Sequence, residues 1–310
     1  MKSVDVLLST FNGDKYLEAQ IESIISQEFS NWKLLVRDDM SSDNTLTILT
    51  RYKNLYPDKI FLFHDECGNL GVVKSFSLLM EKSNSEYVAF CDQDDVWLPN
   101  KLNTQLEFIV KAENEYGTNT PILIQSDLRV VDSDLNTLSA SFWSYQNLEP
   151  ENMMDLSVLM LHNFVTGCGC VINRKLLELS TPIPSGVIMH DWWIGLLAQS
   201  LGHIIVIDDK LVLYRQHGDN QVGANRWGKE MLLASLRFHF LSSLRKQLRV
   251  KSNQASLLLD LPDLGINEKK LITAFSGLFD KNWLARRVEL IKSKLHMSGK
   301  LRNVVLFLMI

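Results

Sequence analysis

The sequence predicts an α/β protein with a mostly parallel central sheet flanked by helices and with a helical extension at the C-terminus. Three observations support this fold class. Strand-like and helix-like runs alternate through the first 130 residues, polar residues follow the predicted strands, and residues 228–310 carry helical patterns rich in Leu, Lys and Arg. Regular alternation of strands and helices is typical of parallel sheets with helices on both faces.

The first half contains four predicted strands, each followed by a predicted helix. Leu17, Ile21 and Ile24 recur at helical spacing. Asp43 is a residue type that begins helices, and Pro99 suits a first helical turn. The strands are expected at residues 4–8, 33–36, 60–63 and 87–90, and the helices at 15–26, 43–52, 72–81 and 99–111.

The pattern becomes less regular in the second half. We expect strands at 121–131 and 165–172, helices at 154–161 and 191–200, a hairpin of 203–207 with 211–214, and long amphipathic helices at 230–250 and 269–293. The change in character near Trp227 divides the chain into a main domain, 1–227, and a helical tail, 228–310.

Composition excludes several classes of protein. The 310 residues are 46% hydrophobic and 22% charged, which is ordinary for a globular protein, and the net charge of −4 gives no reason to expect a nucleic-acid partner. The four cysteines are too few and too irregularly spaced for a disulfide framework or a four-ligand zinc site. We expect Cys168 and Cys170 to pack as small residues in a strand.

A cluster of carboxylates follows the apolar run at residues 87–90. Asp92, Asp94 and Asp95 fall at the C-terminal end of this predicted buried strand, where open α/β sheets bind ligands. Like charges at 4 Å repel by roughly 4 kcal/mol per pair at an effective dielectric near 20. A solvated turn or helix cap is the alternative, but the position after a buried strand favours a metal site.

The other three strands of the first half also end in polar loops, at residues 9–13, 37–43 and 68–71. In a parallel sheet these loops lie along one edge and can converge on a single ligand. Helix N-termini and glycine-freed backbone N–H groups suit phosphate. The chain lacks both the dinucleotide fingerprint and the P-loop signature, which disfavours a hydride-transfer enzyme and an ATPase.

The ordered set of these loops resembles family 2 inverting glycosyltransferases with the Rossmann-like GT-A fold, in their bacterial rhamnosyltransferase-like branch. The similarity covers about residues 3–220, and it rests on Ser9-Thr10-Phe11-Asn12, Arg37-Asp38-Asp39-Met40-Ser41-Ser42-Asp43, Asn69-Leu70-Gly71 and Cys91-Asp92-Gln93-Asp94-Asp95-Val96-Trp97. The resemblance implies a nucleotide-binding half over residues 1–100 and an acceptor half over residues 101–227.

The resemblance assigns a donor site to the first half. Asp38 matches the carboxylate that meets the nucleotide base, and Asp92 and Asp94 match the Asp-x-Asp pair that positions the diphosphate through Mg²⁺ or Mn²⁺. Met40 stands where the family often has Gly, so this turn is expected to be built differently. The remaining residues expected near the nucleotide are Thr10, Asn12, Asn69, Lys74 and Gln93.

The second half is expected to supply the catalytic base and further donor contacts. An inverting transfer needs one carboxylate to take the proton of the acceptor hydroxyl, and Asp191 matches the acidic residue of the family at this position. Its place at a helix N-terminus should keep it ionised; helix capping is the alternative role. Arg215 is expected to neutralise the diphosphate, and His217 is expected to bind the metal or else to be a solvated side chain.

The expected reaction transfers L-rhamnose from dTDP-rhamnose to a saccharide or lipid-linked acceptor in bacterial surface polysaccharide synthesis. Other sugars on a UDP donor remain alternatives. A sugar nucleotidyltransferase and an inactive sugar-binding module are the rival classes. Trp192 and Trp193 are each expected either to stack on a sugar or to lie in the core.

The tail is expected to contact a membrane surface. Leu232, Leu236 and Leu244 alternate with Arg245 and Arg249 in a basic amphipathic pattern. A homodimer interface and packing on the main domain are the alternatives. The N-terminus lacks the long apolar core of a signal peptide, so we expect a cytoplasmic protein that binds peripherally to the inner face of the cytoplasmic membrane.

Overall fold

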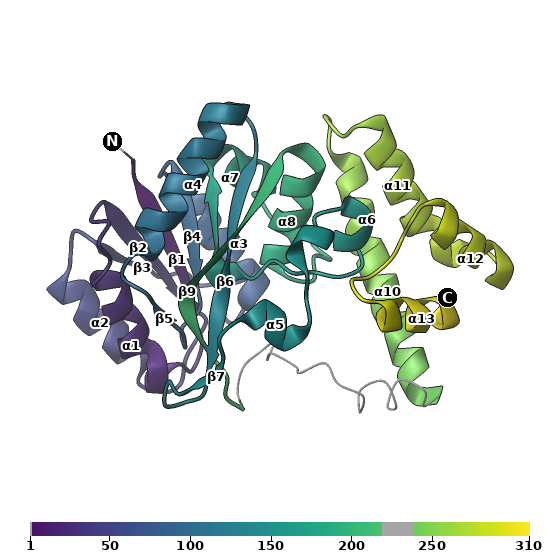
Figure 1. The fold of residues 1–310 in the computed structure, drawn as a ribbon. Helices are drawn as coiled ribbons and strands as arrows, with labels where there is room; N and C mark the ends of the chain where they lie inside the picture. The colour runs from purple at the N-terminus through teal and green to yellow at the C-terminus, as the bar shows by residue number, and fades with distance from the viewer. Residues whose placement is uncertain (1, 219–237) are drawn as a thin grey trace.

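The computed structural model describes residues 2–218 and 238–310, and its central feature is a nine-stranded sheet (Figure 1). The strand order is β3-β2-β1-β4-β8-β6-β9-β5, and β7 pairs with β6. The strands are β1 (Val4–Thr10), β2 (Trp32–Asp38), β3 (Ile60–Phe63), β4 (Tyr87–Cys91), β5 (Val96–Trp97), β6 (Ile122–Val131), β7 (Thr137–Ser139), β8 (Cys170–Asn173) and β9 (His203–Arg215).

The predicted alternation of the first half is confirmed. Strands β3, β2, β1 and β4 are parallel neighbours, and the register places Thr10 opposite Asp38. Every residue of β4 is buried, as its apolar sequence predicts. The helices that connect and follow these strands are α1 (Asp14–Ile25), α2 (Thr45–Leu55), α3 (Val72–Lys82) and α4 (Lys101–Tyr116). The four predicted loops therefore lie at one edge of the sheet.

The second half extends the sheet with strands of both directions. Strand β8 is antiparallel to β4 and β6, whereas β9 runs parallel to β6. The helical segments of this half are α5 (Phe142–Gln146), η1 (Pro150–Asn152), α6 (Leu156–Leu159), η2 (Gly167–Gly169), α7 (Arg174–Ser180) and α8 (His190–Leu201). Helix α8 packs against β6 and β9. It is therefore joined to the same sheet whose edge carries the loops of the first half.

The prediction of a terminal hairpin was wrong. Residues 203–215 form the single strand β9, which pairs with β6 from His203 to Arg215 with two register shifts on the way. The register shifts between Ile207 and Lys210, so Asp208 and Asp209 form a bulge rather than a turn. The Asp127 carboxylate on β6 stabilises this region, because it accepts the Leu128 N–H at 2.8 Å and lies 3.8 Å from Lys210 Nζ.

Two further predicted elements were wrong in detail. The strand expected at 165–172 is confirmed only for β8, since Cys168 lies in the short helix η2. The helix expected at 269–293 is broken near Gly277, and Asn282 starts a new helix by accepting the Ala285 N–H at 3.0 Å.

The described part of the tail is helical, as predicted. It consists of α10 (Phe238–Ser256), η3 (Leu257–Asp260), α11 (Ile266–Ser276), η4 (Gly277–Asp280), α12 (Trp283–Lys292) and α13 (Lys300–Met309). Figure 1 places these helices at the opposite end of the molecule from α1 and α2. The domain boundary predicted at residue 227, with Leu232 and Leu236, lies outside the described residues. Among the described helices, none combines the length and apolar character needed to cross a bilayer.

The turn after β2 contains a backbone position that favours glycine. Met40 has a φ of 67°, a conformation that Gly adopts readily, and its side chain is 63% exposed. The turn therefore keeps a glycine-like backbone, and the difference from the family lies in the added side chain.

Met40→Gly should change the free energy of unfolding by between zero and about 1 kcal/mol in favour of the folded state. Met40→Val should instead destabilise by about 1–2 kcal/mol, because a β-branched residue strains this conformation further. Urea unfolding of both variants checks the pair; equal stabilities would contradict it.

Candidate functional site

Three residues predicted to contact the nucleotide form one hydrogen-bonded network at the ends of β1 and β2. Thr10 Oγ1 donates to Asp38 Oδ1 at 2.8 Å, and the Ser41 N–H donates to Asp38 Oδ2 at 2.8 Å. The Asn12 N–H donates to Ser41 Oγ at 2.9 Å, and Asn12 Oδ1 accepts the Ser42 N–H at 2.8 Å. Thr10, Asn12 and Asp38 are therefore held together before any ligand binds.

A buried ion pair joins this network to the loop before α3. Arg37 Nη1 lies 2.5 Å from Asp39 Oδ1, and Arg37 Nε lies 2.7 Å from Asp65 Oδ2. Burial alone would raise the pKa of Asp39, yet hydrogen bonds from Leu70, Arg37 and Gly71 bring this pKa below its ordinary value. The hydrogen bond from Arg37 lowers the pKa of Asp65 to about 2. Sequence reasoning missed this role, since only the fold brings the three charges together.

The remaining first-half residues differ in their surroundings. Asn69 Nδ2 donates to the Asp39 carbonyl at 2.9 Å. Gln93 Oε1 accepts the Phe11 N–H at 2.8 Å, and Gln93 Nε2 donates to the Phe11 carbonyl at 3.0 Å. The side chains of Asn69 and Gln93 thus tie neighbouring loops together. Lys74 is exposed on the first turn of α3.

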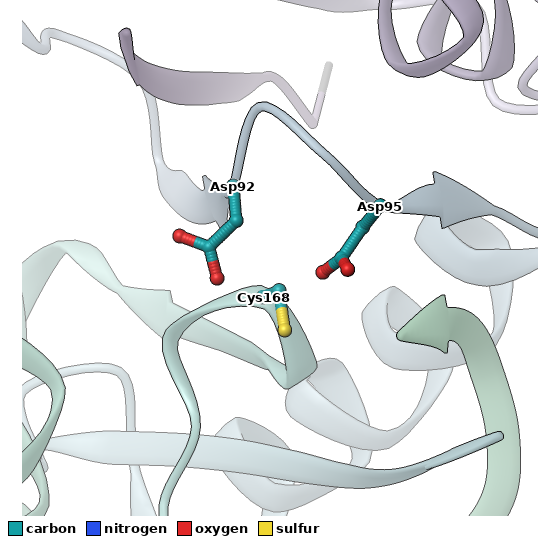
Figure 2. A group of neighbouring side chains, drawn as sticks. All are labelled: Asp92, Asp95 and Cys168. Atoms are coloured by element: carbon teal, nitrogen blue, oxygen red, sulfur yellow. The ribbon is translucent and has the colours of Figure 1, made fainter. Parts of the chain in front are cut away.

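The acidic loop after β4 meets a cysteine from the second half. Ligand atoms of Asp92, Asp95 and Cys168 all lie within 4.8 Å of one another. Figure 2 shows both carboxylates reaching from the loop toward Cys168 on the turn before β8. Asp95 is fully buried; its Oδ1 accepts the Arg215 N–H at 3.0 Å, and its carboxyl group also interacts with the Cys168 thiol. The arrangement presents carboxylate oxygens at the carboxyl end of β4.

The electrostatics of this cluster favour a positively charged ligand. Burial, followed by repulsion from Asp94 and Asp191, raises the pKa of Asp92 to about 7. Burial and the neighbouring Asp94 and Asp92 charges raise the pKa of Asp95 well above its ordinary value. Because each carboxylate disfavours the ionisation of the others, a cation among them would relieve the repulsion.

The end of β9 brings two more predicted residues to the acids. His217 Nε2 lies 2.8 Å from Asp94 Oδ2, within hydrogen-bond distance. Arg215 is buried, and its Nε donates to the Asp94 carbonyl at 2.7 Å. Its Nη1 also donates to the Ser133 carbonyl. The Arg215–His217 segment is therefore fixed against the acidic loop by contacts from both residues.

Tyr16 on α1 supports this segment, and sequence reasoning missed it. The Arg215 guanidinium lies 4.4 Å from the centre of the Tyr16 ring, and the ring centres of Tyr16 and His217 are 4.8 Å apart. Cation–π contacts of this kind stabilise by about 0.5–1 kcal/mol. Tyr16→Leu should therefore lower the free energy of unfolding by at least about 0.5–1 kcal/mol, whereas Tyr16→Phe should retain the wild-type value. Urea unfolding of both variants measures this, and equal values for Leu and Phe would refute the role.

Asp191, the predicted base, lies in the first turn of α8. Its Oδ1 accepts the Trp192 N–H at 2.6 Å and its Oδ2 accepts the Gly167 N–H at 3.0 Å. Burial raises the pKa of Asp191 to about 6, although both N–H groups favour the ionised form. Burial therefore outweighs the helix N-terminus in setting the pKa of Asp191. The N-cap of α8 is Met189, so Asp191 is not the capping residue.

The aromatic residues of α8 belong to the core. Trp192 and Trp193 are both buried, and Trp192 Nε1 donates to the Leu159 carbonyl at 2.7 Å. His190 stacks on Phe76 with ring centres 4.0 Å apart, and burial lowers the pKa of His190 to about 3. These contacts fix the start of α8, and with it the position of Asp191.

The site therefore has two parts within the described residues. The first contains Thr10, Asn12 and Asp38, and the Asp39 carbonyl joins Asn69 to it. The second gathers acidic and basic residues from the loop after β4, the end of β9 with the residues that follow it, and the first turn of α8, namely Asp92, Asp94, Asp95, Asp191, Arg215 and His217. Gln93 connects the two parts through Phe11. Carboxylate oxygens of this kind suit Mg²⁺ or Mn²⁺.

Solved structures identify the fold. The crystal structure of S. aureus TarS, residues 1–349, matches 94% of this chain and 81% of its own length, with a TM-score of 0.60 and 17% sequence identity. The shared architecture is the GT-A glycosyltransferase fold, as predicted.

Sequence comparison identifies the family. The model of "Glycosyl transferase family 2" matches residues 5–179. The chain is 28% identical over 230 residues to dTDP-rhamnosyl transferase RfbG of Shigella flexneri, across 70% of this chain and 74% of that relative. It is 31% identical over 108 residues to UDP-Glc:alpha-D-GlcNAc-diphosphoundecaprenol beta-1,3-glucosyltransferase WfgD of Escherichia coli, across 35% and 41% of the two chains. The chain belongs to glycosyl transferase family 2, and its class of activity is glycosyl transfer.

Proposed function

We propose that the chain is an inverting, metal-dependent glycosyltransferase that moves L-rhamnose from dTDP-L-rhamnose to a saccharide or lipid-linked acceptor in bacterial surface polysaccharide synthesis. One observation carries the proposal: groups distant in the sequence meet at one sheet edge. Asp94 Oδ2 lies 2.8 Å from His217 Nε2, and the charge of Asp191 contributes to the raised pKa of Asp92. This combination supports a diphosphate site next to a general base.

In this reaction Asp191 accepts the proton of the acceptor hydroxyl. The hydroxyl oxygen bonds to the anomeric carbon while the bond from that carbon to the diphosphate oxygen breaks. One displacement inverts the anomeric configuration, and no covalent enzyme intermediate forms. Arg215 lies beside the acidic loop, where its charge stabilises the departing diphosphate.

Asp94 and His217 would hold the divalent cation in this proposal. Their donor atoms converge at 2.8 Å, next to the buried Asp95 of the same acidic loop. When bound, the cation supplies positive charge to the diphosphate leaving group. Asp92 and Arg215 then orient the donor, while Thr10, Asn12, Asp38, Asn69, Lys74 and Gln93 lie on the nucleotide side.

The choice of donor draws support from the relatives. RfbG is named for dTDP-rhamnosyl transfer and aligns over most of both chains. WfgD is named for a UDP-Glc donor and a diphosphoundecaprenol-linked acceptor, but aligns over a shorter region. We therefore place dTDP-rhamnose first and a UDP-sugar second. The proposed domains are a catalytic domain over residues 1–227, with nucleotide and acceptor halves, and the tail over residues 228–310.

A donor assay with added Mn²⁺ or Mg²⁺ tests the proposed function. Incubation with dTDP-rhamnose and a panel of UDP-sugars should release nucleoside diphosphate, and the true donor should also raise the melting temperature most. Release of pyrophosphate would support a nucleotidyltransferase instead. Absence of both products with every donor would support an inactive sugar-binding module.

The raised pKa of Asp191 predicts the pH dependence of transfer. The base must be ionised, so activity should be full above the pKa of about 6 and fall as the pH drops through it. Two titratable groups interact electrostatically with Asp191: Asp92, which follows β4, and the Cys170 thiol on β8. A profile of kcat/KM against pH measures the acidic limb. A limb centred near the ordinary Asp pKa of about 4 would contradict the assignment.

The setting of the enzyme is part of the proposal. A nucleotide-sugar donor and a lipid-linked acceptor suit a cytoplasmic protein that binds peripherally to the inner face of the membrane. Dimerisation through the tail is the alternative role of these helices. Analytical ultracentrifugation with and without lipid vesicles separates the two, because a dimer forms without lipid.

A further inference from the structure

The last two helices carry an uncovered apolar surface. Of the eighteen large apolar side chains that are exposed in the described residues, eight lie on α12 and α13. Their exposed fractions range from 41% for Phe307 to 70% for Ile291. We call this surface the α12–α13 face, and its members are Trp283, Leu284, Val288, Ile291, Leu301, Val304, Phe307 and Leu308.

Spacing places these residues on the outer sides of both helices. On α12, Leu284, Val288 and Ile291 follow one another at intervals of four and three residues, while Leu290 on the inner side is buried. On α13, Leu301, Val304 and Leu308 repeat the pattern with intervals of three and four, and Leu306 is buried. Each helix therefore has a packed face and an unpacked apolar face.

Arg287 joins the two apolar rows into one surface. Its guanidinium lies 3.8 Å from the centre of the Trp283 ring on α12 and 5.3 Å from the centre of the Phe307 ring on α13. The inner side of α13 is fixed to the main domain, since Arg302 Nη2 donates to the Gln146 carbonyl and Arg302 Nη1 to the Asn147 carbonyl, both at 2.9 Å. The exposed rows thus belong to a docked pair of helices.

Charge identifies the partner of this face. Residues 281–310 contain seven Lys and Arg residues and one acidic residue, Glu289, although the whole chain has a net charge of −4. Lys292, Lys294 and Lys300 are exposed at the ends of the two helices. A second copy of this face would bring like charges together, whereas an anionic lipid surface complements them. Exposed Trp and aliphatic side chains beside lysines are typical of interfacial helices.

We propose that the α12–α13 face binds an anionic phospholipid bilayer, with its apolar side chains in the acyl region and its lysines at the phosphate groups. This inference rests on the proposed function, because that function includes a lipid-linked acceptor. It names the surface that would hold the enzyme at the membrane. The α12–α13 face is a different segment from the one expected from sequence, residues 232–249, part of which lies outside the described residues.

Vesicle co-sedimentation of the full chain tests the proposal. The wild-type protein should bind phosphatidylglycerol vesicles at least tenfold more tightly than phosphatidylcholine vesicles. Replacing four exposed residues together, Leu284→Gln, Ile291→Gln, Val304→Gln and Leu308→Gln, should weaken binding at least tenfold. The matched control replaces three exposed residues of the main domain, Leu55→Gln, Tyr116→Gln and Leu138→Gln, and should bind as wild type. Replacing Lys292, Lys294 and Lys300 by Gln should weaken binding roughly 100-fold.

Three results would overturn the proposal: no binding of wild-type protein to anionic vesicles, equal binding by the four-residue variant and its control, or a wild-type dimer that the four-residue variant converts to monomers. Glutamine favours helices, and all four sites are more than half exposed, so the variant should fold normally. Nucleoside diphosphate release measured without vesicles tests the enzyme separately. Wild-type protein that binds vesicles but releases no product contradicts the proposed function and supports the face.

Discussion

Asp191→Asn should reduce kcat for sugar transfer by about 1,000-fold and leave the donor dissociation constant within about twofold of wild type. The amide keeps the shape of the carboxylate but cannot accept the proton of the acceptor hydroxyl. Asp191 is held by N–H donors from Gly167 at 3.0 Å and Trp192 at 2.6 Å, so its position is set by the backbone. Transfer kinetics and calorimetric titration with the donor measure the two quantities independently.

Asp155→Asn is the matched control for this prediction. Asp155 stands at the N-terminus of another helix, as the residue before the first turn of α6, but it is exposed and lies outside the acidic cluster. Its replacement should leave kcat within about twofold of wild type. Retention of more than a tenth of wild-type turnover by Asp191→Asn would remove Asp191 as the base. A comparable loss in the Asp155 control would show that the effect is not specific to the site.

Asp94→Asn and His217→Gln should each abolish the dependence of donor binding on the divalent cation. Their donor atoms lie 2.8 Å apart, and both belong to segments fixed by Arg215. Losing even an outer-shell partner typically weakens metal affinity about 10–100-fold, so loss of a ligand should have at least that effect. Calorimetric titration of the donor with Mn²⁺ and with EDTA should give equal, weak affinities for both variants.

Asp134→Asn is the control for the metal prediction. Asp134 is an exposed carboxylate beside Ser133, whose carbonyl accepts a hydrogen bond from Arg215. Its variant should keep the full response to Mn²⁺, because its carboxylate is not part of the cluster. If Asp94→Asn and His217→Gln respond to Mn²⁺ as this control does, the cation is held elsewhere.

Local sequence patterns predicted the nucleotide half well for physical reasons. Strands β1 and β4 are buried on both faces, so most of their residues are apolar, and the helices of this half have regular apolar spacing. The carboxylates after β4 could be placed because parallel strands end at one edge. The resemblance to a family supplied Asp191, Arg215 and His217, which no local pattern joins to the acids.

The remaining features depend on distant partners. Asp208 and Asp209 suggested a turn, but β9 pairs with β6 on both sides of them and contains them as a bulge. Cys168 lies next to Asp95 only because β8 inserts between β4 and β6. Tyr16 contacts Arg215 from a helix about 200 residues earlier in the sequence. Such contacts between distant segments leave no periodic signal in the sequence.

The central claim is that acids at the edge of the sheet hold a divalent cation beneath the diphosphate of a nucleotide sugar. Crystals soaked with Mn²⁺ and dTDP, followed by anomalous diffraction at the manganese edge, test it most directly. The account predicts a single strong peak in coordinating contact with the Asp94 carboxylate, His217 Nε2 and the diphosphate oxygens. Bound dTDP with no anomalous peak at these two side chains would contradict it.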